Sequence, residues 1–275
     1  MKKIIKISFL LFVLLSVFGC VSFFRLSDLQ LDGYTFPNNR DKAKLLLQEM
    51  GVAHKIHMWD SIETYNVIFE DEFHGFLGKK SNSFKEQKMA FSLDYIPKIF
   101  TGQLEIISGK EKGDIWGIQS GETYRKNING EIEVKMNKNM KFYIPTYQYF
   151  IEFPNRIQEA SAVDYMGTKI INGIECEGVI ASWNTVSPQK DLDQYVIWLD
   201  SQSKRIVKIE YTVRDKYNFV SGAANFQDYK DYSGFILPSQ LPVESNLLKE
   251  GYLHTMTIVN FTPNKLSSSM LRPLN

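Results

Sequence analysis

The sequence predicts an α+β fold that is mainly β: a curved antiparallel sheet of about ten strands, a half-barrel, with short helices covering its open side. From residue 61 to 263 apolar and polar residues largely alternate in short segments, which is the period of a strand. The connections are short and rich in turn residues, as in NING at 127–130, so consecutive strands should pair antiparallel. An aromatic segment at 139–160 interrupts this pattern. Because about ten strands curl, their concave side needs a cover, and this segment is the candidate.

The first nineteen residues are predicted to form an export signal peptide. MKKIIK carries three lysines and no acid, and the twelve residues from Ile7 to Phe18 carry no charge. The next step rests on a resemblance: Val17-Phe18-Gly19-Cys20 resembles the bacterial lipobox, in which lipid is attached to the cysteine and the chain is cut just before it. We therefore expect Cys20 to be the lipidated first residue of the mature chain, with residues 20–38 as a tether.

Two alternatives to the lipid anchor are open. The charge-free stretch continues to Phe24, and its eighteen residues would make a helix of about 27 Å, so an uncleaved signal anchor could span the bilayer. Either anchor places the domain outside the cytoplasm. A disulfide between Cys20 and Cys176 is the weaker reading, because Cys176 lies in a predicted strand as a small buried thiol. Val21 is not the Asp that retains lipoproteins in the inner membrane of some bacteria, so we expect the outer membrane, facing the periplasm.

Composition excludes several classes of function. Without the three lysines of the leader the basic residues fall from 32 to 29 against 31 acidic ones, a net charge of −2, which offers no basic surface for nucleic acid. The sequence has no nucleophile elbow, phosphate-binding loop, dinucleotide fingerprint or pair of catalytic carboxylates. We therefore expect a protein that is not an enzyme and carries no cofactor.

Residues 39–265 are predicted to form one domain, followed by a C-terminal tail at 266–275. A helix should begin near Arg40, capped by Asn39 or the residue before it, with Leu46 and Met50 on its inner face.

Strand-like segments make up most of the rest. Those of the first half are 61–73, 89–96, 102–108, 114–119, 122–127 and 131–136. We interpret EDEF at 70–73 as a solvated turn at a strand end. In the second half, the segment around Cys176 is a strand and 194–215 is the strongest hairpin, while 219–245 and 252–263 supply about three more strands.

The aromatic segment at 139–160 is predicted to be helical. Because a proline removes a helical hydrogen bond and restricts the residue before it, Pro145 and Pro154 predict short helical pieces and no continuous helix.

The second half carries a family resemblance. YVIWLDSQSKRIVKIEYTVRD and NFQDYKDYSGFILPSQLPVES resemble periplasmic lipoprotein carriers and receptors of the LolA/LolB type, with Asp228-Tyr229, Gly234 and Pro238 in matching order. The resemblance extends over residues 40–262 in the general order of helical and strand-like segments, and it is specific over residues 195–244. It implies a curved sheet plugged by helices around an apolar cavity for acyl chains. The residues expected to contact such a ligand are Phe142, Tyr143, Tyr147, Tyr149, Phe150, Trp183 and Trp198.

One group of residues has metal-like spacing. His54, His57 and Asp60 follow one another at intervals of three, which can place them on one helical face. A zinc site needs a further ligand with suitable geometry, so ordinary structural roles are favoured and no metal is expected. Trp59 is expected to be a core anchor.

The sequence therefore predicts a membrane-anchored lipoprotein that binds an acyl chain, a lipid or another hydrophobic ligand, with a role in lipid or lipoprotein trafficking and an envelope protein as a candidate partner. The alternative is a structural or assembly lipoprotein whose barrel is filled by its own side chains. A metal-dependent hydrolase ranks last.

Overall fold

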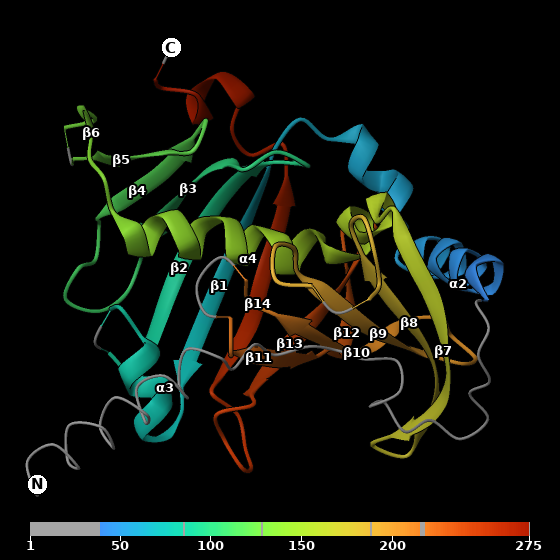
Figure 1. The fold of residues 1–275 in the computed structure, drawn as a ribbon. Helices are drawn as coiled ribbons and strands as arrows, with labels where there is room; N and C mark the ends of the chain where they lie inside the picture. Colours follow the sequence, from blue (N-terminus) through green and yellow to red (C-terminus); the bar gives the residue numbers. More distant parts are fainter. Residues whose placement is uncertain (1–38, 85, 128, 188, 215–217, 275) are drawn as a thin grey trace, which may run out of the picture.

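The computed structural model describes residues 39–274 apart from 85, 128, 188 and 215–217 (Figure 1). The leader, Cys20 and the tether lie outside these residues. Among the residues described, no helix has both the length and the apolar character that a membrane crossing requires.

The helices are α2 (Arg40–Ala53), α3 (Gly75–Ser81) and α4 (Lys138–Arg156), with 3-10 helices η1 (Ile56–Ser61), η2 (Ile157–Glu159) and η3 (Ser268–Leu271). The strands of the first half are β1 (Tyr65–Phe73), β2 (Lys88–Ile96), β3 (Thr101–Ile106), β4 (Ile115–Gln119), β5 (Glu122–Lys126) and β6 (Ile132–Val134). Those of the second half are β7 (Ala162–Ile171), β8 (Ile174–Ser182), β9 (Gln194–Asp200), β10 (Ile206–Thr212), β11 (Ser221–Asn225), β12 (Gln227–Tyr232), β13 (Phe235–Ser245) and β14 (His254–Pro263).

All the strands belong to one antiparallel sheet, as predicted, but the sheet has 14 strands and not about ten. Its order is β6-β5-β4-β3-β2-β1-β14-β13-β11-β10-β9-β8-β7, with β12 paired to β13 beside this path. The chain builds outward from β1 to the β6 edge, crosses to the β7 edge and builds back to β14. The last strand then pairs with the first, so the two halves join at the centre of the sheet.

The path of the chain explains why α4 covers the concave side. It connects β6 to β7, which are the two opposite edges of the sheet, and it runs across the hollow of the sheet (Figure 1). Its 19 residues span about 28 Å. Helix α2 packs at the far edge against β7 and β8.

The prediction of short helical pieces at 139–160 is wrong, because α4 is continuous from Lys138 to Arg156 with Pro145 and Pro154 inside it. Each proline lacks the N–H that would bond the carbonyl four residues earlier. The helix persists because most of its side chains are buried against the sheet, so tertiary packing outweighs the local cost. The side chain of Asn137 caps its start by accepting from the N–H groups of Asn139 and Met140.

Two apolar cores lie on opposite faces of the sheet. The main core fills the concave side and contains alternate residues such as Val179 and Ile197. A smaller core on the outer face contains Cys176, Ile180 and Trp198. The structure thus confirms Cys176 as a fully buried side chain in a strand, while Cys20, the other cysteine of the sequence, lies outside the described residues.

Other local predictions have mixed outcomes. Helix α2 begins at Arg40 as predicted, but the side chain of Asn39 makes no capping bond. Trp59 is a core anchor, as predicted, and packs edge-on against Tyr65 and Phe235. The interpretation of EDEF as a solvated turn is wrong, because β1 continues through Phe73 and Asp71 is fully buried.

The C-terminal residues pack against the sheet. Helix η3 lies against β2 and β3, and Leu271 is fully buried. The hydroxyl of Thr64 donates to the carbonyl of Leu266, and the N–H of Leu274 donates to Gln119 Oε1 at 3.0 Å.

Candidate functional site

The interface between α4 and the concave face of the sheet is the candidate site. The buried side chains of α4 recur every three or four residues and form a stripe that faces the sheet. Its members are Met140, Tyr143, Ile144, Tyr147, Gln148, Phe150, Ile151, Glu152, Phe153, Pro154 and Asn155. An apolar and aromatic stripe with three embedded polar residues, Gln148, Glu152 and Asn155, therefore faces the sheet.

Aromatic pairs connect α4 to both halves of the sheet. Tyr147 lies 4.8 Å from Phe69 on β1, measured between ring centroids. On the other half, Phe153 lies 5.5 Å from Tyr195 on β9. Rings at these separations attract one another beyond the area that they bury. The helix thus contacts strands that are far apart in the sequence.

The structure brings together six of the seven predicted ligand residues. Five lie on α4 and pack with the main core, and Trp183 joins them through Tyr195, at 6.3 Å between centroids. Trp198 does not belong to this group. It lies in the outer core, fully buried, and its indole N–H donates to Glu210 Oε2 at 3.1 Å.

Side chains fill the space beneath α4. Ile144 and Phe153 on the helix have no solvent-accessible surface, and neither do Phe91 and Leu93 on the sheet. A void large enough for a water molecule would give its lining side chains accessible surface, so none borders these four residues. Two hollows of about 360 and 300 Å³ lie on the surface, the first beside the β2–β3 turn and the second on the β13–β14 loop, and neither is lined by α4.

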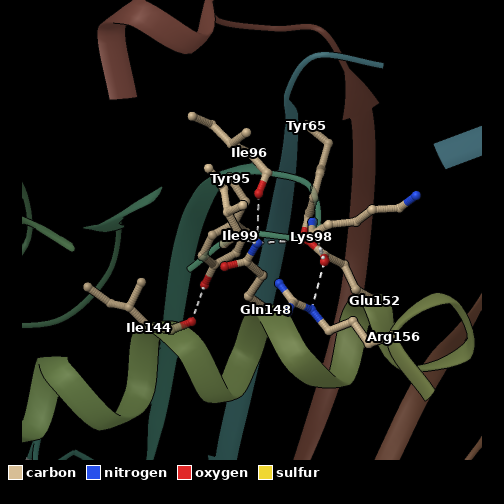
Figure 2. Close-up of polar contacts among 9 residues, drawn as sticks. All are labelled: Tyr65, Tyr95, Ile96, Lys98, Ile99, Ile144, Gln148, Glu152 and Arg156. Atoms are coloured by element: carbon tan, nitrogen blue, oxygen red, sulfur yellow. Dashed lines mark hydrogen bonds and ion pairs between the residues drawn. The ribbon is translucent and has the colours of Figure 1, made fainter. Parts of the chain in front are cut away.

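Polar contacts join α4 to the turn between β2 and β3 (Figure 2). The side-chain amide of Gln148 lies 2.9 Å from the carbonyl oxygen of Ile96 and 2.8 Å from that of Ile99, and it donates to this turn. One turn along the helix, Glu152 Oε2 accepts from the backbone N–H of Lys98 at 2.9 Å. We call Gln148 and Glu152, with these partners, the latch.

Glu152 is the hub of the latch. Its carboxylate also accepts from the hydroxyl of Tyr65 at 2.6 Å and from Nε of Arg156 at 2.8 Å (Figure 2). Burial raises the pKa of Glu152 above 4.5, although Arg156 and the hydrogen bonds act in the opposite direction. The guanidinium of Arg156 lies 4.3 Å above the ring of Phe100 on the same turn.

A second buried polar group fixes the middle of α4. The hydroxyl of Tyr147 donates to Asp71 Oδ2 at 3.0 Å, and Oδ1 of the same carboxylate lies 2.7 Å from Nδ1 of His254 on β14. Sequence reasoning missed this group. The available signal was strand period, because Asp71 shares the inward positions of Phe69 and Phe73 on β1.

The metal-like residues have separate structural roles. His54 is buried, and its Nε2 accepts from the N–H of Ile206 at 3.2 Å. Asp60 pairs with Lys98 at 2.7 Å. Within the described residues, no group of three or more His, Cys, Asp or Glu side chains is placed to hold a metal ion.

Comparisons with known proteins detect relatives only through structure. No family model and no curated protein matches the sequence. A DUF1329 family protein from Desulfovibrio piger aligns with TM-score 0.54 and 10% identity, over 82% of this chain and 96% of that chain. A protein domain from Vibrio parahaemolyticus, described as outer membrane lipoprotein-sorting, aligns with TM-score 0.54 and 11% identity, over 85% of this chain and 97% of that one.

A LolA superfamily protein from Nitrosomonas europaea aligns with TM-score 0.47 and 10% identity, over 83% of this chain and 96% of that one. At these identities the likeness is one of fold. It agrees with the curved sheet and the helix across its hollow described above, and the chain therefore has a LolA-like fold.

Proposed function

We propose that this chain is a lipoprotein of the bacterial envelope, anchored through Cys20, that binds an acyl chain or another hydrophobic ligand beneath α4. The observation that carries the proposal is the construction of the concave face. It is lined mainly by apolar and aromatic side chains, and α4 lies across it, with α2 and η1 contributing side chains to the same core. Ligand sites for apolar molecules are concave and lined mostly by apolar side chains.

The bound ligand takes the place of side chains from α4, because no water-sized space borders the innermost residues when the helix is seated. The helix must therefore move away from the sheet before a chain can enter. Hydrogen bonds of Tyr143, Ile144 and Tyr147 resist this movement, and the latch concentrates several more at the β2–β3 turn. On this proposal the structure is the closed, unloaded state of a carrier.

Native mass spectrometry of the full chain, purified from the envelope of its host, tests the anchor and the ligand together. We expect a chain that begins at Cys20, with added acyl mass on that residue, and a fraction with a further non-covalent lipid. A chain that begins at Met1 without modification contradicts the lipid anchor. Absence of non-covalent lipid counts against the carrier role.

A latch variant tests the route of entry. Gln148→Ala removes the amide that bonds the β2–β3 turn, and we expect it to speed uptake of a fluorescent fatty acid several-fold over the wild type. Gln202→Ala, on an exposed turn between β9 and β10, is the matched control and should leave uptake unchanged. Equal rates in the two variants would mean that opening at the latch does not limit entry.

A non-catalytic structural or assembly role is the second candidate, and the complete packing under α4 favours it. In this case the interior is a core, and neither the wild type nor Gln148→Ala binds the fluorescent fatty acid. Binding by either protein excludes this alternative.

A further inference from the structure

One edge of β6 has no neighbouring strand among the described residues. Among the strands that the structure describes, β6 is the last in the strand order and pairs with β5 alone (Figure 1). The opposite edge is blunted, since β7 contains a register shift between Tyr165 and Thr168 and packs against α2. Of these two edges, β6 is the one without a bulge or a covering helix.

Side chains alternate along this edge. In the run Ile132-Glu133-Val134-Lys135-Met136, the apolar residues share one face with Tyr124, which lies opposite Val134 on β5. Val134 is 60% exposed and Met136 is 66% exposed. The two charged residues of the run, Glu133 and Lys135, are also exposed. The edge thus presents an apolar face and a charged face to solvent.

Hydrogen bonding to β5 determines which backbone groups point outward. The N–H of Lys135 donates to the carbonyl of Thr123, and the N–H of Asn127 donates to the carbonyl of Glu131. The backbone groups of residues 131, 133 and 135 therefore face β5. Those of Ile132 and Val134 point away from the sheet, where they can bond another strand.

Charge selects one register for pairing with a second copy of this edge. In an antiparallel pair, outward residues must lie opposite outward residues. Centring the pair on Val134 places Glu133 opposite Lys135 of the second copy, twice by symmetry. A shift of one residue pair in one direction places Glu133 opposite Glu133, although Glu131 then faces Lys135, and a shift in the other direction places Lys135 opposite Lys135. The centred register is the one of these three that pairs Glu133 with Lys135 and brings no like charges together. Like charges directly opposite one another destabilise a strand pair, whereas opposite charges stabilise it.

We propose that a second copy of this chain binds antiparallel along β6, with Val134 on the two-fold axis. Both sheets then continue into one another, and Ile132 lies opposite Met136 of the second copy. The interface is isologous, as expected of a two-fold dimer. It is short, so we expect a reversible dimer that is favoured by high local concentration. Glu133 and Lys135, which would repel most other strands from the edge, make it specific for itself.

Charge substitutions at these two positions test the pairing. The readout is sedimentation velocity of the full chain in density-matched detergent over a concentration series, where the wild type should shift from monomer to dimer. Glu133→Lys places lysines opposite each other at both symmetric pairs, and Lys135→Glu does the same with glutamates. Each should weaken dimerisation about tenfold or more. Lys112→Glu, exposed on another loop, is the control and should dimerise like the wild type.

Mixing provides the decisive result. An equimolar mixture of the two single variants pairs two lysines with two glutamates, so it should form the dimer that neither variant forms alone. The double variant with both substitutions should also regain it. The segment before residue 39 is unchanged in every variant, so its self-association cannot produce this pattern. A wild type that stays monomeric at every concentration overturns the proposal, and so do single variants that dimerise normally or a mixture that does not recover.

Discussion

His54 shows how burial determines the chemistry of a single side chain. Its sequence spacing suggested metal-like chemistry, but the ring is enclosed by the core and lies 5.3 Å from the ring of Tyr229. Burial, with a smaller contribution from the nearby charge of Arg205, lowers the pKa of His54 to about 3. The imidazole is therefore neutral in the folded protein at any pH at which the protein would function.

This shift predicts acid sensitivity. The unfolded chain binds a proton on His54 below pH 6.5 while the folded chain does not, so stability is lost as the pH falls from 6.5 toward 3. Between pH 7.5 and 5 the wild type should lose about 2 kcal/mol more than His54→Gln, whose side-chain oxygen can still accept from Ile206. Urea unfolding at both pH values measures the difference.

The control is His57→Gln, at an exposed position, which should behave like the wild type. If His54→Gln loses as much unfolding free energy between the two pH values as the wild type, His54 is not the source of the acid sensitivity.

At the scale of the element, α4 shows how tertiary packing overrides local preference. Two prolines argue against a 19-residue helix, yet the helix is continuous because its inner stripe is buried along the whole length. The same stripe carries the latch. One element therefore provides the cover, much of the core and the polar contacts that hold the cover closed.

The packing of α4 predicts a large cost for truncating a buried ring near its C-terminal end. Phe153 is fully buried and contacts Tyr149 and Tyr195, so Phe153→Ala should lower the free energy of unfolding by about 3–5 kcal/mol. Phe76→Ala removes the same ring from a site that is 74% exposed and should change it by less than about 0.5 kcal/mol. Chemical denaturation compares the two. Similar losses in both variants would mean that α4 is not packed as described.

At the scale of the whole molecule, the order of the strands determines where everything else lies. The meander ends at β6 and restarts at β7, so the connection must cross the hollow. Strand β1 pairs with β14, which lies near the end of the chain, and η3 then packs beside β2 and β3. The integrity of the sheet thus depends on residues from both ends of the described chain.

This closure predicts that the C-terminal segment contributes to global stability. Leu271→Ala empties a fully buried site and should cost about 2–4 kcal/mol. Its neighbour Met270 is 56% exposed, so Met270→Ala should be close to neutral. Thermal unfolding of both variants gives the comparison. If Leu271→Ala is as stable as the wild type, the segment is an appendage and does not belong to the core.

The latch and the buried Asp71 show why part of the site escaped sequence reasoning. Gln148 and Glu152 lie four residues apart on a predicted helical stretch, but their partners on the β2–β3 turn are about fifty residues away along the chain. Asp71 looked like a surface acid because its neighbours are acidic. Its partners, Tyr147 and His254, lie 76 and 183 residues further along the sequence.

The sequence by itself determined the elements that depend on local pattern: the antiparallel strands, the helix from Arg40, the anchor role of Trp59 and the resemblance to LolA-type proteins. The alternation of side chains and the choice of turn residues depend on residues that are close together in the sequence. They can therefore be recognised in a single sequence. Tertiary structure alone decided the number of strands, the continuity of α4, the place of Trp198 on the outer face and the close packing of residues such as Ile144 and Phe153 under α4. These features depend on contacts between segments that are distant in the sequence, and local pattern does not encode their energies.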